Sequence, residues 1–289
     1  MHIQRGAWAE INLDAVAHNV QMAKANLKPT TKLCAVVKAD AYGHGAVRVA
    51  QEAARNGADF FAVALLQEGV KLREAGIETP ILVLGSMLPE VAEICVRYDI
   101  SHAVFDEERL YALNAAALKL HTKAKIHIKI DTGMHRIGVH VRDAGRFAKL
   151  AASLPGIYIE GVFSHFATAD ADDKQYAAYQ FERFQEALRL IEAEGVHIPI
   201  RHIANSAALT ELQEYQLDMV RQGITLYGLH PAHMIDCYKN FEPVMTVKTQ
   251  VAFVKTLPPG ETIGYGRTYT LTRPSVIATV PIGYADGVS

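Results

Sequence analysis

Short runs of continuously apolar residues recur along the chain at intervals of about 20 to 40 residues, and a segment with helical periodicity follows each run. Continuous apolar character, in contrast to apolar–polar alternation, is typical of strands that are covered on both faces of a parallel sheet. The pattern therefore restricts the chain to folds in which parallel strands alternate with helices. The eight expected strands are Leu33–Lys38, Phe60–Leu65, Pro80–Gly85, His102–Phe105, Ile126–Asp131, Ile157–His165, Arg201–Asn205 and Met219–Ile224.

The segments between these runs place apolar residues three and four positions apart, as an amphipathic helix requires. Leu110, Leu113 and Ala117 have this spacing, and Asp106 before them is a candidate N-cap. Three further helices are expected on the same grounds: residues 13–27 with Asn12 as a cap, residues 47–56 ended by Gly57, and residues 181–191 ended by Gly195.

Eight strands that alternate with helices over about 220 residues fit a (β/α)8 barrel of the TIM type, an α/β fold that typically needs about 250 residues. A doubly wound open sheet is the rival, because strand count alone does not separate the two folds. We expect the barrel to span residues 11–230.

After about Leu229 the pattern changes to strand-like pieces separated by prolines, with no helical periodicity between them. The pieces are Val244–Lys255, Tyr269–Leu271 and Val276–Val280. We expect residues 1–10 and 231–289 to form an incomplete, mostly β domain. A β domain of about 60 residues with unpaired final strands would be poorly closed. We therefore expect the chain to be truncated at its C-terminus.

The composition excludes several classes of protein. A formal net charge of −2 without a run of one sign argues against a nucleic-acid or membrane-surface protein. The chain has neither a signal peptide nor a stretch of roughly 18 apolar residues, so a cytoplasmic protein is expected. The three cysteines, Cys34, Cys95 and Cys237, lie far apart in apolar runs and are expected to be buried free thiols.

Reactive side chains follow the ends of the expected strands, which is where the working residues of a barrel enzyme lie. They are Lys38 and Tyr42 after the first strand, Arg136 after the fifth, His165 after the sixth, Asn205 and Ser206 after the seventh, and Arg221, Gly223 and Ile224 at the eighth.

Lys38 ends an apolar run, where desolvation would lower its pKa and favour the neutral amine that attacks a carbonyl carbon. The alternative is a lysine that leaves the strand end to pair with Asp40. Ser206 and Gly223 lie in the two loops where barrels often bind phosphate. Here too an alternative stays open, because Ser206 could simply cap a helix at residues 207–212.

Several longer motifs resemble those of the alanine racemase family. They are AVVKADAYGHG at residues 35–45, KIDTGMHRIG at 129–138, Asn205-Ser206, VRQGI at 220–224, GYGRTY at 264–269 and IGYADG at 282–287. They occur in the family's order over essentially the whole chain. The resemblance implies interconversion of L-alanine and D-alanine with pyridoxal 5′-phosphate, which supplies D-alanine for the bacterial cell wall.

The resemblance also implies roles for individual residues. Racemisation removes a proton from one face of Cα and returns it on the other, so it implies two bases: Lys38, which carries the cofactor, and Tyr265 from the other subunit of a homodimer. The remaining implied roles are Arg136 near that tyrosine, the substrate and the cofactor's phenolic oxygen, Arg221 at the cofactor's ring nitrogen with His165 behind it, Tyr42, Ser206, Gly223 and Ile224 at the phosphate, Asn205 at the cofactor, Tyr284 at the substrate entrance and Lys129 as a lysine that can be carbamylated.

Two groups of residues have plainer interpretations. Lys129 is as readily an ordinary strand lysine paired with an acid. His127, His135 and His140 lack a metal-ligand spacing with second acids, so no metal site is expected and surface or loop positions are favoured.

Other functions on the same scaffold stay open. A broad-specificity racemase would differ only in pocket width, and a basic amino-acid decarboxylase is disfavoured because Arg221 stands where an acid would be needed. A non-catalytic carrier of pyridoxal phosphate would lack the segment that bears Tyr265. An inactive, cofactor-binding fragment is the last alternative.

Overall fold

The computed structural model describes residues 6–231 and 238–288, which form two compact units. One unit comprises Leu13–Val244, and the other combines the first twelve residues with Met245–Ser289. Cys237 and the first five residues lie outside the described part of the chain, whereas Cys34 and Cys95 are buried free thiols as expected.

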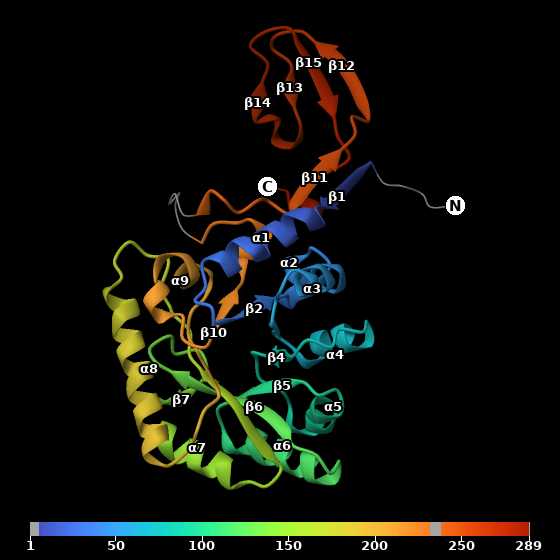
Figure 1. Ribbon diagram of the computed structural model, residues 1–289. Coiled ribbons are helices and arrows are strands. Elements are labelled where there is room, and N and C mark those ends of the chain that lie inside the picture. The colour runs from blue at the N-terminus through green and yellow to red at the C-terminus, as the bar shows by residue number, and fades with distance from the viewer. Residues whose placement is uncertain (1–5, 232–237, 289) are drawn as a thin grey trace. The chain divides into compact units, whose positions relative to one another are not determined.

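Eight parallel strands form the centre of the first unit (Figure 1). Their order is β10-β2-β3-β4-β5-β6-β8-β9, and the short strand β7 (Val139–His140) pairs with the end of β6. Each of the eight lies within or overlaps an apolar run identified in the sequence. Their bounds are β2 Lys32–Val36, β3 Phe60–Val63, β4 Ile81–Val83, β5 Ser101–Val104, β6 Ala124–Asp131, β8 Ile157–Phe163, β9 Ile200–His202 and β10 Met219–Gln222.

The two ends of this sheet meet, so the strands form a nearly closed barrel. Asp218 N–H donates to Arg201 O at 3.1 Å and Arg221 N–H donates to Ala204 O at 3.1 Å, which links β10 to the strand and loop of β9. An ion pair between Arg201 Nε and Asp218 Oδ2 at 2.7 Å reinforces the seam. The predicted barrel is confirmed and the open sheet is excluded.

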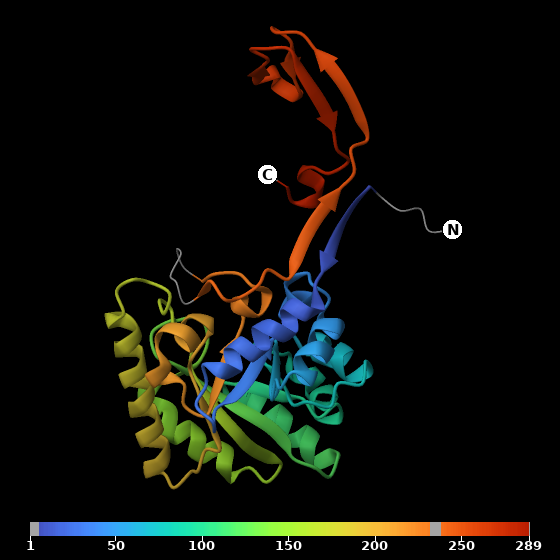
Figure 2. The same ribbon diagram turned by 45° about the horizontal axis from the view of Figure 1, so that its top comes forward.

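Helices cover the outside of the strands (Figures 1 and 2). Asp106 is the N-cap of α6, with its side chain accepting from Arg109 N–H as expected, whereas the first helix ends at Ala25 and does not reach Leu27. The helices are α1 Leu13–Ala25, α2 Lys38–Tyr42, α3 Ala46–Arg55, α4 Leu66–Glu74, α5 Ala92–Arg97, α6 Glu107–Lys119, α7 Ala144–Ser153, α8 Gln175–Ala193 and α9 Ser206–Glu211. Short 3-10 turns are η1 Pro89–Val91, η2 Val141–Asp143, η3 Gln213–Tyr215 and η4 Ile224–Tyr227.

The segment before Val244 packs on the barrel. Asn19 on α1 accepts a hydrogen bond from Glu242 N–H at 2.8 Å and donates to Glu242 O at 2.8 Å, and Tyr238 is fully buried. A buried asparagine that satisfies the backbone of a distant segment fixes that segment in place. The barrel unit thus ends at Val244, whereas the sequence placed the boundary at residue 230.

The second unit consists of strands and short turns within its described residues. Three antiparallel pairs are present, and Leu271, directly after β14, is the one buried apolar residue among the described residues of this unit. The predicted β character is confirmed, but the expected strand Val244–Lys255 is two strands, β11 and part of β12. The elements are β1 Ala7–Ile11 paired with β11 Met245–Thr249, β12 Phe253–Leu257 paired with β15 Ser275–Thr279, β13 Thr262–Ile263 paired with β14 Tyr269–Thr270, and the turns η6 Tyr265–Arg267 and η7 Tyr284–Asp286.

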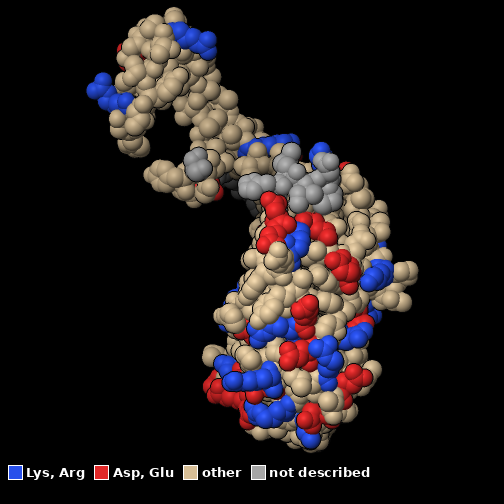
Figure 3. Space-filling model, turned by 90° about the vertical axis from the view of Figure 1, so that its left-hand side faces the viewer, with Lys and Arg blue, Asp and Glu red and all other residues tan. Residues whose placement is uncertain are grey.

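Two surface features bear on the expected partners. Lysine and arginine side chains are interspersed with aspartate and glutamate over the face of the barrel unit in Figure 3. Within the described residues, no helix combines the length and the apolar character needed to span a bilayer.

Candidate active site

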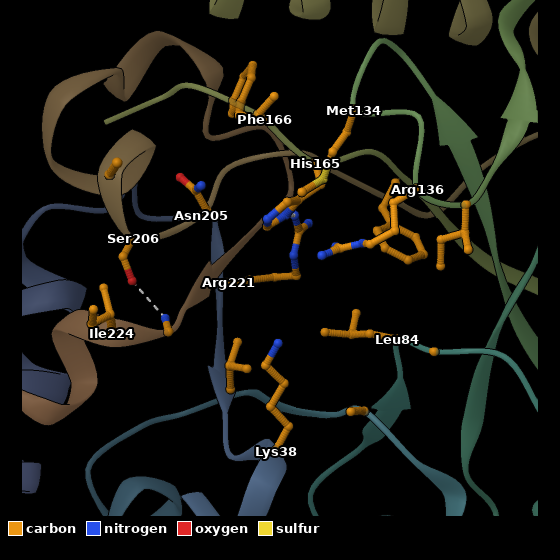
Figure 4. A pocket seen from close by; sticks show the side chains of 18 of the residues that line it. Lys38, Leu84, Met134, Arg136, His165, Phe166, Asn205, Ser206, Arg221 and Ile224 are labelled. Carbon is orange, nitrogen blue, oxygen red and sulfur yellow. Dashed lines mark hydrogen bonds between the residues drawn. The ribbon is translucent and has the colours of Figure 1, made fainter. Parts of the chain in front are cut away.

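A cavity of about 610 Å³ opens among the loops at the carboxyl ends of the barrel strands. It is lined by side chains that follow β2, β6, β8, β9 and β10, which converge from separate parts of the sequence (Figure 4). Ten of the expected site residues line it: Lys38, Tyr42, Lys129, Arg136, His165, Asn205, Ser206, Arg221, Gly223 and Ile224.

Lys38 begins an unusual turn at the end of β2. Its side chain points into the cavity toward Arg221 (Figure 4), half-buried. The next four residues, Ala39 to Tyr42, all have positive φ values of 51–55° although none is glycine. Such a left-handed turn costs L-residues roughly 1–2 kcal/mol each, so surrounding contacts must hold it.

Glu68 on α4 supplies the main contact. Its Oε1 accepts from Ala39 N–H at 2.6 Å, and its Oε2 accepts from Ala64 N–H at 2.8 Å and Leu65 N–H at 3.0 Å. One carboxylate thus ties the residue after Lys38 to the loop after β3. Hydrogen bonds to a charged acceptor are about twice as strong as neutral ones, which suits a strained segment.

The lysine is not engaged by the acid that follows it. Asp40 Oδ1 is 3.1 Å from Lys71 Nζ and accepts from Ala46 N–H at 3.1 Å, and these contacts lower the pKa of Asp40. Among the described residues Lys38 forms no ion pair. The alternative of a lysine that leaves the strand end to pair with Asp40 is therefore wrong.

A small cradle lies on the other side of the cavity. Ser206 Oγ accepts from Gly223 N–H at 2.8 Å (Figure 4), joining the two loops after β9 and β10. A Cβ added to Gly223 would lie 3.6 Å from Ser206 Oγ and 4.0 Å from Tyr42 Oη, so the three groups surround one point. Backbone N–H and hydroxyl donors around a glycine are suited to a phosphate group.

Ser206 does not act as a helix cap. Asn205 is the N-cap of α9, and its Oδ1 accepts from Ala208 N–H at 3.1 Å. The alternative of a capping serine is therefore wrong, and its hydroxyl is left to the neighbouring loop.

Arg221 is buried at the floor of the cavity without a carboxylate partner among the described residues. Its Nη2 donates to Ser164 O at 2.9 Å and Ile203 O at 3.0 Å and lies 3.0 Å from His165 Nδ1. Its Nη1 lies 2.8 Å from His202 Nδ1. Burial lowers the pKa of Arg221 to about 10, which leaves it charged at neutral pH.

Both histidines next to Arg221 are neutral. Burial, followed by the charge of Arg221, lowers the pKa of His165 and of His202 well below the ordinary value. Because an arginine only donates, His202 accepts at Nδ1 and carries its proton on Nε2. His165 Nδ1 lies next to Arg221 Nη2, which also donates to the two carbonyl oxygens, and the His165 ring lines the cavity.

Lys129 is buried and is not paired with an acid. Its Nζ donates to Ile130 O at 2.8 Å and lies 5.3 Å from the centroid of the Phe163 ring. Burial and the nearby Arg221 lower its pKa to about 7. The plainer interpretation, an ordinary strand lysine with an acidic partner, is wrong.

The cavity is strongly cationic. Its described lining includes Lys38, Lys129, Arg136 and Arg221 but a single acid, Asp170. Opposite charge adds favourable Coulomb energy in a partly desolvated site, so a small polyanionic ligand matches it.

Tyr265 and Tyr284 lie in the second unit and do not line this cavity. They sit in η6 and η7, and 99% and 87% of their surfaces are exposed.

Sequence reasoning missed several supporting residues. The expectation of a surface position is wrong for His127, which is fully buried, while His135 and His140 are exposed. Glu160 and His202 also lie in apolar strands, where a polar residue amid a buried run was the available signal. Glu68 had no such signal, because it lies on an ordinary helix.

The chain is similar to known proteins over nearly its whole length. The family model described as "Alanine racemase, N-terminal domain" matches residues 11–231, and the model for the C-terminal domain matches residues 244–289. The alanine racemase of Desulfovibrio desulfuricans is 46% identical over 283 residues, covering 98% of this chain and 76% of that protein. The alanine racemase of Halothermothrix orenii is 46% identical over 285 residues, covering 99% and 75%.

Solved structures give the same result. Alanine racemase from Clostridium difficile 630 superposes with a TM-score of 0.94 at 40% identity, covering 100% of this chain and 76% of that one. Alanine racemase from Bacillus anthracis, solved with bound L-Ala-P, has a TM-score of 0.91 at 38% identity, covering 99% and 75%. With both family models matched along the chain and these relatives aligned over nearly all of it, this protein belongs to the alanine racemase family of isomerases.

Proposed function

We propose that this protein binds pyridoxal 5′-phosphate through Lys38 and interconverts L-alanine and D-alanine. The observation that carries the proposal is the cavity itself, where a lysine amine faces a buried, acid-free arginine and a glycine–serine–tyrosine cradle. The product D-alanine would supply bacterial peptidoglycan, and we propose that the enzyme works in the cytoplasm.

The residues present fit the cofactor. Tyr42, Ser206 and Gly223, which surround one point of the cavity, would hold its phosphate together with Ile224, which lines the same cavity. Arg221 would face the ring nitrogen, and Asn205 lines the same cavity. When bound, pyridoxal 5′-phosphate supplies an electron sink that makes the Cα proton of the amino acid acidic.

The identity of the residue that faces the ring nitrogen would determine which reaction the bound cofactor supports. Arg221 stays protonated and donates, so the ring nitrogen would remain largely unprotonated and the electron sink would be moderate. A moderate sink favours return of the proton to Cα over transamination or decarboxylation.

Two bases on opposite faces of the substrate follow from the stereochemistry. The Lys38 amine would take or return the proton on one face. Tyr265 of a second copy of the chain would serve the other face, as the family resemblance implies, and its side chain is 99% exposed and so free to meet another copy. Arg136 would stabilise its phenolate and orient the substrate, and Tyr284 of that copy would border the entrance. The proposal therefore requires a homodimer with shared active sites.

We also propose that Lys129 is carbamylated. At a pKa of about 7 its amine is partly neutral and can add to CO₂, forming an N–C bond and releasing a proton to water. The resulting anion would partly offset the cationic cavity and lie near Arg136 and Arg221, which both act on the Lys129 pKa.

The test is an assay of D-alanine formation from L-alanine, with and without added pyridoxal 5′-phosphate and with a panel of other amino acids. We expect cofactor-dependent racemisation in both directions that Lys38→Ala abolishes. Comparable rates on bulkier amino acids would favour a broad-specificity racemase. Cofactor binding without turnover would overturn the proposal in favour of a non-catalytic fragment.

A further inference from the structure

A chain of buried polar groups runs from the cavity floor into the interior of the barrel. Arg221 Nη1 lies 2.8 Å from His202 Nδ1, and His202 Nε2 lies 2.9 Å from His127 Nδ1. His127 Nε2 lies 3.0 Å from Glu160 Oε2, which also accepts from Ser101 Oγ at 2.5 Å. These residues come from β5, β6, β8, β9 and β10, so the chain crosses the barrel.

Hydrogen-bond chemistry permits one direction along this chain. Arg221 has no acceptor, so His202 Nδ1 must accept and the neutral ring carries its proton on Nε2. That proton is donated to His127 Nδ1, which leaves the His127 proton on Nε2, facing Glu160. A second proton on His127 would set one N–H against another, so both histidines are neutral.

Glu160 ends the chain as the acceptor. Burial raises the pKa of Glu160, but the contacts with His127 and Ser101, together with the charge of Lys125, outweigh it and hold the pKa below its ordinary value. An ionised carboxylate cannot donate, so it enforces the direction of every preceding bond. It is also the acid nearest along this network to Arg221, with two neutral rings between them.

We infer that Glu160 and His127 are positioning residues for Arg221: by accepting at the far end of the chain, they stabilise the same His202 tautomer that Arg221 requires, and thereby hold the guanidinium in its orientation at the cavity floor. The inference rests on the proposed function, in which Arg221 faces the ring nitrogen of the cofactor. His202 packs parallel to the Phe163 ring, at 4.9 Å between centroids and 7° between planes, so its ring has little freedom to turn. The tautomer is then the variable that decides whether Nδ1 accepts or repels Arg221.

The direct test needs no substitution. In protein with ¹⁵N-labelled histidine and without cofactor, the nitrogen shifts report the tautomer of each ring. We expect His127 and His202 both to be neutral with the proton on Nε2. A proton on Nδ1 of His202, or a doubly protonated His127, would overturn the inference. Because no cofactor is present, this result is independent of the proposed function.

Substitutions test the link to Arg221. Glu160→Leu removes the terminal acceptor, whereas Glu160→Gln keeps an amide oxygen that can accept from His127. We expect Glu160→Leu to mix the histidine tautomers and to raise the dissociation constant of pyridoxal 5′-phosphate ~5–10-fold, the size of one ordinary net hydrogen bond. In Glu160→Gln, the histidine tautomers and the dissociation constant should stay close to those of the unsubstituted protein.

The control is Glu186→Gln, which changes an exposed acid on α8. We expect it to leave the tautomers and the cofactor affinity unchanged. Equal behaviour of Glu160→Leu and this control would refute the positioning role. Equal losses of cofactor affinity in Glu160→Leu and Glu160→Gln would also refute it, because the amide oxygen of glutamine can still accept from His127 and should preserve a positioning role.

Discussion

Glu68→Gln is the substitution that most sharply probes how the strand end presents Lys38. The carboxylate accepts three backbone N–H groups, two at Oε2 and one at Oε1. A glutamine side chain has one acceptor oxygen and one donor nitrogen. Whichever way the amide turns, at least one backbone N–H then faces another donor.

The expected loss of folding free energy follows from the hydrogen bond that the substitution removes. The Ala39 N–H to Oε1 distance of 2.6 Å marks a charge-assisted hydrogen bond, and such bonds contribute about 1.5–3 kcal/mol. Glu68 is only half-buried, so the lower part of that range is expected. Because the next residues form a left-handed turn, the same loss should also loosen the placement of Lys38.

The assay is urea unfolding of the protein without cofactor, together with a titration with pyridoxal 5′-phosphate followed by absorbance. We expect the free energy of unfolding to fall by about 1.5–2 kcal/mol and the cofactor to bind several-fold more weakly. Glu74→Gln is the matched control, since Glu74 lies on the same helix and accepts from the Tyr98 hydroxyl at 3.2 Å. If Glu68→Gln were no more destabilising than this control, the turn would be held by other contacts, and the reasoning would fail.

Three other predictions concern the proposed chemistry. Tyr265→Phe should abolish proton abstraction from one enantiomer and spare the other, so deuterium wash-in should become strongly asymmetric; equal losses would contradict a two-base assignment. Arg221→Glu should raise pyruvate formation relative to racemisation, because an acid would let the ring nitrogen take a proton; an unchanged ratio argues against the role of Arg221. The pKa of Lys129 is lowered from 10.5 to about 7, so between these values the unfolded chain binds a proton that the folded chain does not. Stability should therefore rise with pH across that window in CO₂-free buffer, and urea unfolding at pH 7 and pH 9 should show no such rise in Lys129→Met.

The barrel could be predicted because its signal is local. Each strand lies in a short run of mostly apolar residues, and Asp106 marks a helix start by its own chemistry. That the site residues lie close together also follows from the fold, because the carboxyl ends of parallel barrel strands lie on one face of the barrel. The positions of Lys38, Arg221 and Ser206 at strand ends are therefore enough to predict that they share one site.

The features that sequence reasoning missed depend on contacts between distant residues. In the sequence His127 lies between two lysines, which is typical of a surface position. Its hydrogen-bond partners Glu160 and His202 come from later strands. The left-handed turn after Lys38 contains no glycine until Gly43, so no turn rule marks it. Asn205 and Ser206 are both good caps, and only the loop after β10 shows which one is free.

The β unit illustrates a different limit. The sequence predicts the strand-like pieces of this unit. The division of residues 244–255 into β11 and β12 depends on the partner strand of each half. β11 pairs with the N-terminal strand β1 and β12 pairs with β15, and neither pairing leaves a mark in the sequence of that segment.

The central claim is that Lys38 carries pyridoxal 5′-phosphate in this cavity. It is tested by recording the near-visible absorbance of the purified protein, reducing it with borohydride and mapping the modified peptide by mass spectrometry. The account predicts an absorbance band of covalently bound cofactor and a reduced cofactor mass on Lys38 alone. No band after addition of the cofactor, or a mass on another lysine such as Lys129, would contradict it.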